Sequence, residues 1–129
     1  MNQTVRPGDF AAVESLLSRY FDGLYASDAP ALAAIFHPQA NYVCAVDGDF
    51  IYRTMNEYLP IVAKRESPAS RNEARRDRIV SIEFAGPAAA VARVNCAIGE
   101  RFFTDILTLV RENGEWRIVS KVFHYDKAG

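Results

Sequence analysis

Asp105 and His124 are the two residues of this sequence whose types and placement could carry proton-transfer chemistry. A carboxylate that orients an imidazole makes a general base that works near neutral pH. Asp105 lies in an apolar run, where a charged carboxylate is costly unless it is paired or protonated. Two interpretations stay open for each residue. Asp105 is either a pocket acid or base, or a buried carboxylate that bonds a helix terminus or a tyrosine. His124 is either its partner or an exposed histidine at the end of a strand.

The separation of these two residues depends on the register of a predicted β-hairpin. Two long apolar-rich runs flank Asn113-Gly114, and an Asn-Gly pair in this setting predicts a two-residue turn, because that turn needs positive φ at both positions. Counting outward from the turn pairs Asp105 with Val122 and Phe103 with His124. Asp105 and His124 are then diagonal neighbours on one face, about 7–8 Å apart at Cα, and their side chains could meet.

This face of the hairpin is apolar near the turn and polar at the far end, as expected for the wall of a closed-bottom pocket. Alternation of side chains predicts that it carries Phe103, Asp105, Leu107, Leu109, Trp116, Ile118, Ser120, Val122 and His124. Trp116 is expected at the pocket floor. Tyr20 and Tyr42 could direct hydroxyl groups into the same pocket, although such aromatic residues are more often core residues with a bonded hydroxyl. Cys44 is interpreted as an inert core thiol next to the pocket, since a nucleophile needs an activating base.

The opposite face of the hairpin is also apolar and predicts a partner. It carries Phe102, Thr104, Ile106, Thr108, Val110, Arg117, Val119, Lys121, Phe123 and Tyr125. We expect a homodimer through this outer sheet face, because a large apolar face is rarely left to water. Lys121 is unusual between Val119 and Phe123. It could pair with an acid of a second chain or extend to the sheet edge.

Composition restricts the class of protein. The chain has 129 residues, half of them hydrophobic, and a formal net charge of −1. This length predicts one domain, residues 1–129, and the charge gives no reason to expect binding to nucleic acid or an anionic membrane. No apolar run approaches the roughly 20 residues of a membrane span, and no secretory signal is present.

Cys44 and Cys96 lack metal spacing, which predicts buried thiols in a reducing cytoplasm. The motifs of nucleotide, zinc and serine-hydrolase sites are missing, so we expect no cofactor and no metal.

The chain order predicts an α+β fold. After a flexible N-terminal arm (residues 1–8), with Asp9 as N-cap, apolar residues recur at helical spacing to about Ala26. A short helix follows through Ile35, with Ser27 or Asp28 as its cap. Strands are expected over residues 39–46 and 50–53. A third helix begins at a capping box formed by Thr54 and Glu57, and Pro60 should kink or delay it.

Four long strands are expected in the second half of the chain. Residues 77–84 and 89–98 precede the terminal hairpin. Three N-terminal helices should therefore pack on one face of a curved, mostly antiparallel mixed sheet of about six strands. The connector over residues 64–78 holds six basic and three acidic residues. It is interpreted as a solvated loop, with a lid that attracts an anionic ligand as the alternative.

The sequence resembles the nuclear-transport-factor-2-like superfamily over residues 10–126. The residues that carry the resemblance are SRYFDGLYASD, IFHPQANY, the Asp47-Gly48 turn and FTDILTLVRENGEWRIVSKVF. Within the superfamily it is most similar to small bacterial domains called putative lumazine-binding, polyketide-cyclase-like and ketosteroid-isomerase-like. The resemblance implies a cone-shaped fold and a homodimer. It leaves the activity open, because isomerases, cyclases, dehydratases and non-enzymatic binders share this scaffold.

Ketosteroid isomerase is the relative that implies roles for single residues. Its site combines an aspartate base with a tyrosine and a protonated aspartic acid that hydrogen-bond an oxyanion. Tyr20, in an Arg-Tyr step on the first helix, matches the tyrosine, and Asp105 matches the oxyanion aspartate. Cys44 or a neighbour stands at the position of the base, so no carboxylate occupies it.

Three functions remain open from the sequence. The first is a cofactor-independent enzyme that acts on a small apolar ligand, with Asp105 and His124 as acid and base and Tyr20 as donor. The second is a small-molecule-binding module with the same pocket and no chemistry. The third is a dimeric interaction domain with a residual pocket. Hydrogen-bond reach between Asp105 and His124 would favour the first over the second.

Overall fold

The structure, a computed structural model, describes residues 5–127, which form three α-helices, two short 3-10 helices (η1 and η2) and six strands. The predicted N-terminal arm lies partly outside this range, because residues 1–4 are not described. The elements are α1 (Asp9–Ala26), α2 (Ala29–Ile35), β1 (Phe36–Cys44), η1 (Val46–Gly48), β2 (Ile51–Thr54), α3 (Met55–Lys64), η2 (Ala69–Arg71), β3 (Arg78–Phe84), β4 (Ala89–Ile98), β5 (Arg101–Glu112) and β6 (Glu115–Lys127).

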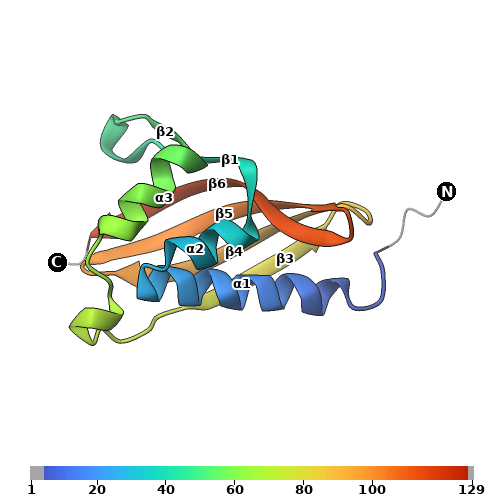
Figure 1. Cartoon of the computed structure of the whole chain (residues 1–129), viewed down its shortest axis with the longest axis horizontal. Coiled ribbons are helices and arrows are strands. Elements are labelled where there is room, and N and C mark those ends of the chain that lie inside the picture. The colour runs from blue at the N-terminus through green and yellow to red at the C-terminus, as the bar shows by residue number, and fades with distance from the viewer. Residues whose placement is uncertain (1–4, 128–129) are drawn as a thin grey trace.

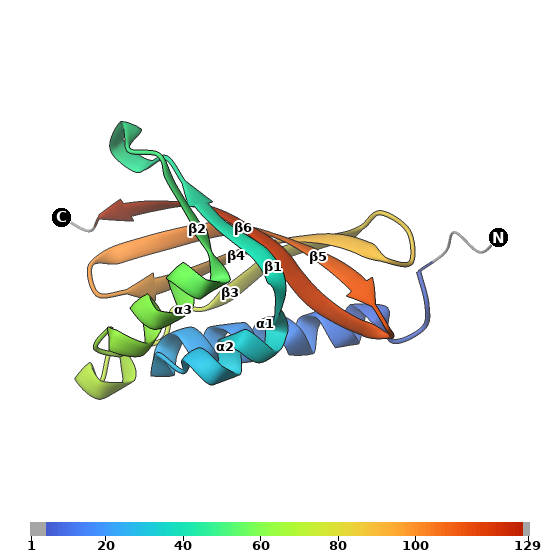
Figure 2. The same cartoon turned by 45° about the horizontal axis from the view of Figure 1, so that its top comes forward.

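The six strands form one mixed sheet in the order β2-β1-β6-β5-β4-β3. All neighbours are antiparallel except β1 and β6, which run parallel. The three helices lie on one face of this sheet (Figures 1 and 2). The predicted α+β class, the N-terminal helices and the number of strands are therefore confirmed.

The ends of α1 follow from local sequence. Gly8, with φ 87°, is the N-cap, so the cap lies one residue before the predicted Asp9. Asp9 instead accepts hydrogen bonds from the backbone N–H of Arg6 at 2.8 Å and from Trp116 Nε1 at 3.2 Å. This second bond ties the start of α1 to β6.

The other two helices begin at the caps that the sequence predicts. Asp28 accepts a hydrogen bond from the backbone N–H of Ala31 and starts α2. Thr54 and Glu57 form the complete capping box of α3. Pro60 lies inside α3, which continues through it to Lys64. Strand bounds shift slightly: β1 begins and ends earlier than the predicted 39–46, and β2 covers 51–54 rather than 50–53.

The predicted register of the β5–β6 hairpin is correct at the turn and wrong beyond Ile118. Asn113 and Gly114 have φ of 53° and 81°, as their turn requires. Leu109 pairs with Ile118, but Thr108 pairs with Ser120, so Val119 is an extra residue in β6. This extra residue forms a β-bulge, and a bulge reverses which side chains face the core beyond it.

The bulge exchanges the two faces of the far half of β6. Asp105 pairs with Phe123 rather than with Val122. Lys121 and Phe123 are buried on the helix-covered face, which we call the inner face. Val122 and His124 are exposed on the opposite, outer face. The predictions that His124 shares a face with Asp105, and that Lys121 lies on the outer face, are therefore wrong.

The core lies between the helices and the inner face of the sheet. Its largest fully buried side chains include Tyr20, Tyr58 and Phe36. The helices approach closely at Gly23, where a Cβ atom would lie 2.7 Å from Leu32 Cδ2. A glycine is therefore needed at this position for α1 and α2 to pack as they do.

Candidate functional site

Asp105 is a fully buried carboxylate at the centre of the inner face. Its Oδ2 accepts a hydrogen bond of 2.6 Å from the hydroxyl of Tyr20 on α1. Burial, followed by the nearby Asp105 charge, raises the pKa of Tyr20 well above its ordinary value, so Tyr20 stays protonated and donates. The second oxygen, Asp105 Oδ1, has no hydrogen-bond partner within the described chain. The structure thus brings together two of the predicted site residues and leaves one carboxylate oxygen unused.

Lys121 is the unexpected member of this site. Its side chain is buried, and its Nζ lies 5.2 to 5.4 Å from the ring centroids of Tyr20, Tyr42, Tyr58 and Phe123. Aromatic faces attract a cation at this range. Burial alone lowers the pKa of the Lys121 ammonium, but the surrounding acidic groups, chiefly Tyr58 and Asp105, outweigh burial and raise the pKa. Lys121 is therefore a buried cation at neutral pH and not an amine nucleophile.

A small cavity of about 20 Å³ lies beside Lys121. It is lined by Leu24, Tyr42, Tyr58, Arg65, Cys96, Ile98, Phe103 and Lys121. Three buried polar atoms of these lining residues have no hydrogen-bond partner in the described part of the chain: Tyr58 Oη, Arg65 Nε and Arg65 Nη2. Buried polar atoms are nearly always bonded, so a cluster without partners calls for an explanation. We call this space the interior cavity.

The interior cavity opens toward one end of the molecule. The C-terminal ends of α1 and α3 and the β4–β5 turn lie at this end, opposite the β5–β6 turn (Figure 2). Arg65 follows α3 directly as its C-cap and begins the connector to β3. The lining residues Ile98 and Phe103 are half-buried there. These half-buried side chains form the rim of the cavity.

The connector over residues 65–77 is tied across this end through Glu73. Glu73 Oε1 accepts a hydrogen bond of 2.8 Å from the backbone N–H of Gly99, and its carbonyl oxygen accepts one of 2.7 Å from the Tyr25 hydroxyl. Arg75 also forms ion pairs with Asp22 and Asp77. The connector is consequently anchored to α1 and to the β4–β5 turn.

The two cysteines differ in their relation to the cavity. Cys96 lines it, and burial first, then the charge of Asp105, raises the pKa of its thiol to about 12. It is therefore protonated and unreactive near neutral pH. Cys44 is buried at the end of β1 and is not among the cavity-lining residues.

His124 and Ser120 lie away from Asp105. His124 is exposed on the outer face, with its Nε2 2.9 Å from Asp126 Oδ1. Ser120 precedes Lys121 at the bulge and pairs with Thr108. The structure does not bring His124 within hydrogen-bond reach of Asp105, because the bulge turns it outward.

The remaining predicted pocket residues divide into two groups. Tyr42 and Phe103 line the interior cavity. Leu107 and Ile118 are fully buried core residues, and Trp116 packs edge-on against Phe84 near the β5–β6 turn. Trp116 is therefore not part of the cavity floor.

The sequence predicts two of the eight cavity-lining residues and misses the other six. Four of the missed residues carry a polar or sulfur atom: Lys121, Tyr58, Arg65 and Cys96. For Lys121 a signal was present, because a lysine between apolar neighbours did not fit the outer face to which strict alternation assigned it. For the other three no comparable signal exists, since a tyrosine on α3, an arginine at a helix end and a cysteine in a strand are ordinary residues in those places.

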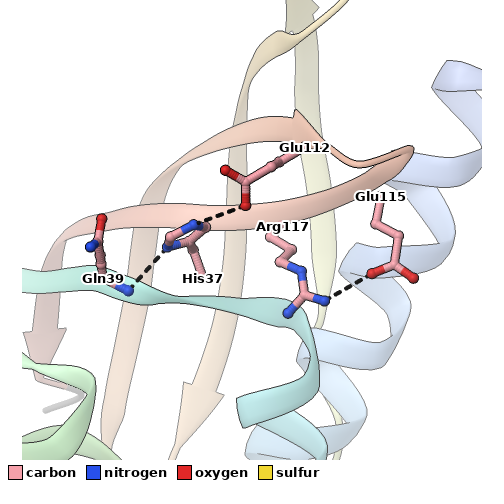
Figure 3. Close-up of polar contacts among 5 residues, drawn as sticks. All are labelled: His37, Gln39, Glu112, Glu115 and Arg117. Carbon is pink, nitrogen blue, oxygen red and sulfur yellow. Dashed lines mark hydrogen bonds and ion pairs between the residues drawn. The ribbon is translucent and has the colours of Figure 1, made fainter.

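A second, larger depression lies on the surface where β1 meets the β5–β6 turn (Figure 3). It has a volume of about 660 Å³ and is lined by His37, Pro38, Gln39, Glu112, Asn113, Glu115 and Arg117. Its charged groups are already paired: His37 Nε2 lies 3.3 Å from Glu112 Oε1, and Arg117 Nη2 lies 2.8 Å from Glu115 Oε2. Exposed pairs of this kind need no ligand, so the interior cavity is the better candidate site.

Residues 5–127 contain neither a cluster of metal ligands nor a helix suited to span a membrane. Within that range, no group of three or more His, Cys, Asp or Glu side chains is placed to hold a metal ion. Likewise, none of the helices in the described range has the length and apolar character needed to cross a membrane.

Comparisons with solved structures support the fold. An NTF-2-like protein of unknown function from Silicibacter pomeroyi DSS-3 is 26% identical, with a TM-score of 0.77 over 91% of this chain and 95% of that chain. One from Shewanella baltica OS155 is 24% identical, with a TM-score of 0.83 over 93% and 95%. A ketosteroid isomerase-like protein from Erwinia carotovora atroseptica SCRI1043 is 12% identical, with a TM-score of 0.71 over 93% and 98%.

The family is shown by sequence. A comparison with curated proteins gives no match. The sequence model of the family described as "Putative lumazine-binding" matches residues 8–124, which is nearly the whole chain. With the fold just described, this match places the chain in the putative lumazine-binding family of the NTF2-like superfamily.

Proposed function

We propose that this protein binds a small molecule in the interior cavity. The observation that carries the proposal is the set of buried, unpartnered polar atoms of the cavity-lining residues: Tyr58 Oη and Arg65 Nε and Nη2. Leaving such groups unsatisfied costs about 1–3 kcal/mol each. A ligand that bonds to them would recover this free energy, and the name of the family is consistent with a small-molecule ligand.

A binding module is favoured over an acid–base enzyme by the position of His124. The proposed dyad needed His124 within reach of Asp105, and His124 instead faces solvent beside Asp126. Tyr20, the expected oxyanion donor, already donates its hydroxyl hydrogen bond to Asp105. The polar groups of the cavity-lining residues that can contact a ligand are cations and hydroxyls, which bind and orient it. No general base lies beside them among these residues.

Filling the cavity tests this proposal. Cys96→Leu adds apolar atoms to a wall of the cavity, and Cys44→Leu adds the same atoms to a buried site outside it. We would screen small planar fragments, lumazine among them, by saturation-transfer NMR. Fragments should bind the native and the Cys44→Leu proteins and fail to bind Cys96→Leu, with circular dichroism confirming that both variants are folded. Absence of fragment binding, or binding that Cys96→Leu leaves unchanged, would contradict the proposal.

We also propose that a second copy of the chain covers the outer face of β5 and β6. Ile106 pairs with Val122 on this face, where Val122 is 46% exposed and Phe102 is 39% exposed. An apolar face of this extent is more stable when it is buried. Since the helices cover only the inner face (Figure 2), the outer face is free to pair with its own copy.

The oligomeric state is the test of this assembly. Light scattering after size exclusion should give twice the 14.4 kDa of one chain at micromolar concentration. Val122→Lys should shift the protein to the monomer, because it would bury an unpaired charge in the interface. Glu83→Lys, on an exposed position of β3, is the control and should remain dimeric. A native protein that elutes as a monomer would refute the assembly.

A further inference from the structure

We propose that the ligand of the interior cavity is a carboxylate, held by the edge of the Arg65 guanidinium and by the ammonium of Lys121. This inference rests on the proposed function and adds the chemical class of the ligand. It depends on three properties of the site: the direction of the free donors of Arg65, the balance of charge, and the shape of the space.

The free donors of Arg65 form a fork. The unpartnered atoms are Nε and Nη2, and their N–H groups point the same way along one edge of the planar guanidinium. Two parallel donors match the two oxygens of a carboxylate, which makes this a strong and specific pairing. A neutral amide offers only one acceptor oxygen to the same edge and would leave the second donor unsatisfied.

The charges at the cavity are not balanced by the protein. Arg65 and Lys121 line it, and Asp105, which accepts a hydrogen bond from Tyr20, is the one buried carboxylate beside them. No ion pair of Arg65 or Lys121 is formed within residues 5–127 at salt-bridge distance, whereas Arg71, Arg75 and Arg117 do form ion pairs. Two cations and one anion leave a single positive charge, which a monoanion neutralises. A cationic ligand would add to the excess.

The shape of the site favours a flat group. Tyr42 and Tyr58 stack with their ring centroids 4.5 Å apart and form one wall of the cavity. A volume of about 20 Å³ is near the minimum for one water molecule, so a planar carboxylate fits with less displacement than a tetrahedral phosphate. The half-buried Arg65, Ile98 and Phe103 at the rim can move to admit the rest of the ligand.

Matched acids and amides test the inference. Formate, acetate and benzoate would be titrated against formamide, acetamide and benzamide, with inorganic phosphate as a further anion. The readout is the NMR signal of the Arg65 Nε–H group together with the dissociation constant. At least one acid should bind ten or more times tighter than its amide and tighter than phosphate. It should also shift the Arg65 signal.

Substitutions in the connector over residues 65–77 show whether Arg65 produces the preference for the acid. Arg65→Met should remove the preference for the acid, and Arg65→Lys should keep only part of it, because lysine retains the charge and loses the fork. Arg76→Met, at an exposed position of the same connector, should change nothing. Equal binding of acid and amide would overturn the inference and leave the proposed function standing. Binding of neutral fragments in the cavity without binding of any acid would also overturn the inference and leave the proposed function standing. Absence of any fragment binding to the native protein, or fragment binding that Cys96→Leu leaves unchanged, would instead remove the proposed function.

Discussion

Lys121→Met should lower the free energy of unfolding by about 3 kcal/mol, because it leaves the buried Asp105 charge uncompensated, although the two side chains lie beyond ion-pair distance and act on each other only through their charges. Methionine fills much of the same space but leaves Asp105 fully buried without its cation. Tyr20 connects the two residues, since its hydroxyl bonds Asp105 and its ring lies 5.2 Å from Lys121 Nζ. Urea unfolding followed by circular dichroism measures the change.

The double variant Lys121→Met, Asp105→Asn shows whether the loss comes from the pair. Asparagine keeps the acceptor for Tyr20 and removes the charge, so the double variant should regain at least half of the lost stability. Replacing a buried ion pair by neutral groups is often nearly neutral. Lys64→Met, at an exposed position of α3, should stay within about 0.5 kcal/mol of the native protein. If the double variant is as unstable as the sum of both single variants, Asp105 and Lys121 are not coupled and the charge balance described above is wrong.

Inserting one alanine between Val122 and Phe123 should abolish cooperative folding. The bulge at Val119 already takes up the one extra residue of β6, and a further residue would reverse the faces of the strand beyond it. His124 would then turn toward the core, and Phe123 would turn into solvent. Neither arrangement is tolerable, because Phe123 packs against Tyr42 and Phe103 on the inner face.

An insertion in a loop provides the control for the β6 insertion. Asp49, between η1 and β2, is exposed, and one alanine inserted after it should leave a cooperative thermal transition. A protein with the β6 insertion that unfolds cooperatively near the native midpoint would mean that the register of β6 does not determine which residues face the cavity.

The elements of the fold could be predicted because their signals are local. The turn at Asn113-Gly114, the capping box at Thr54 and Glu57, and the helical spacing before Ala26 each depend on residues a few positions apart. The bulge at Val119 depends instead on how β6 fits both β5 and the irregular start of β1, where the register also shifts between Phe36 and Asn41. No residue type in β6 indicates such a bulge. The one extra residue, Val119, nevertheless determines the face on which His124 lies.

The candidate site could be predicted only in part for the same reason. Asp105 stands out by its own position and Tyr20 by the resemblance to ketosteroid isomerase, and the structure joins them by a hydrogen bond. Lys121 was assigned to the wrong face by the missed bulge. Tyr58 and Arg65 reach the cavity through the packing of α3 against the sheet, which is a tertiary contact that spacing along the chain does not encode.

A crystal structure of the protein grown with benzoate tests the central claim most directly. We predict the carboxylate in the interior cavity, with its oxygens within hydrogen-bond distance of Arg65 Nε and Nη2 and its charge facing Lys121. The surface depression formed by His37 and Arg117 (Figure 3) should stay free of it. A single water molecule bonded to Tyr58 and Arg65 in the cavity, with benzoate bound elsewhere or not at all, would contradict the claim that this cavity is the ligand site.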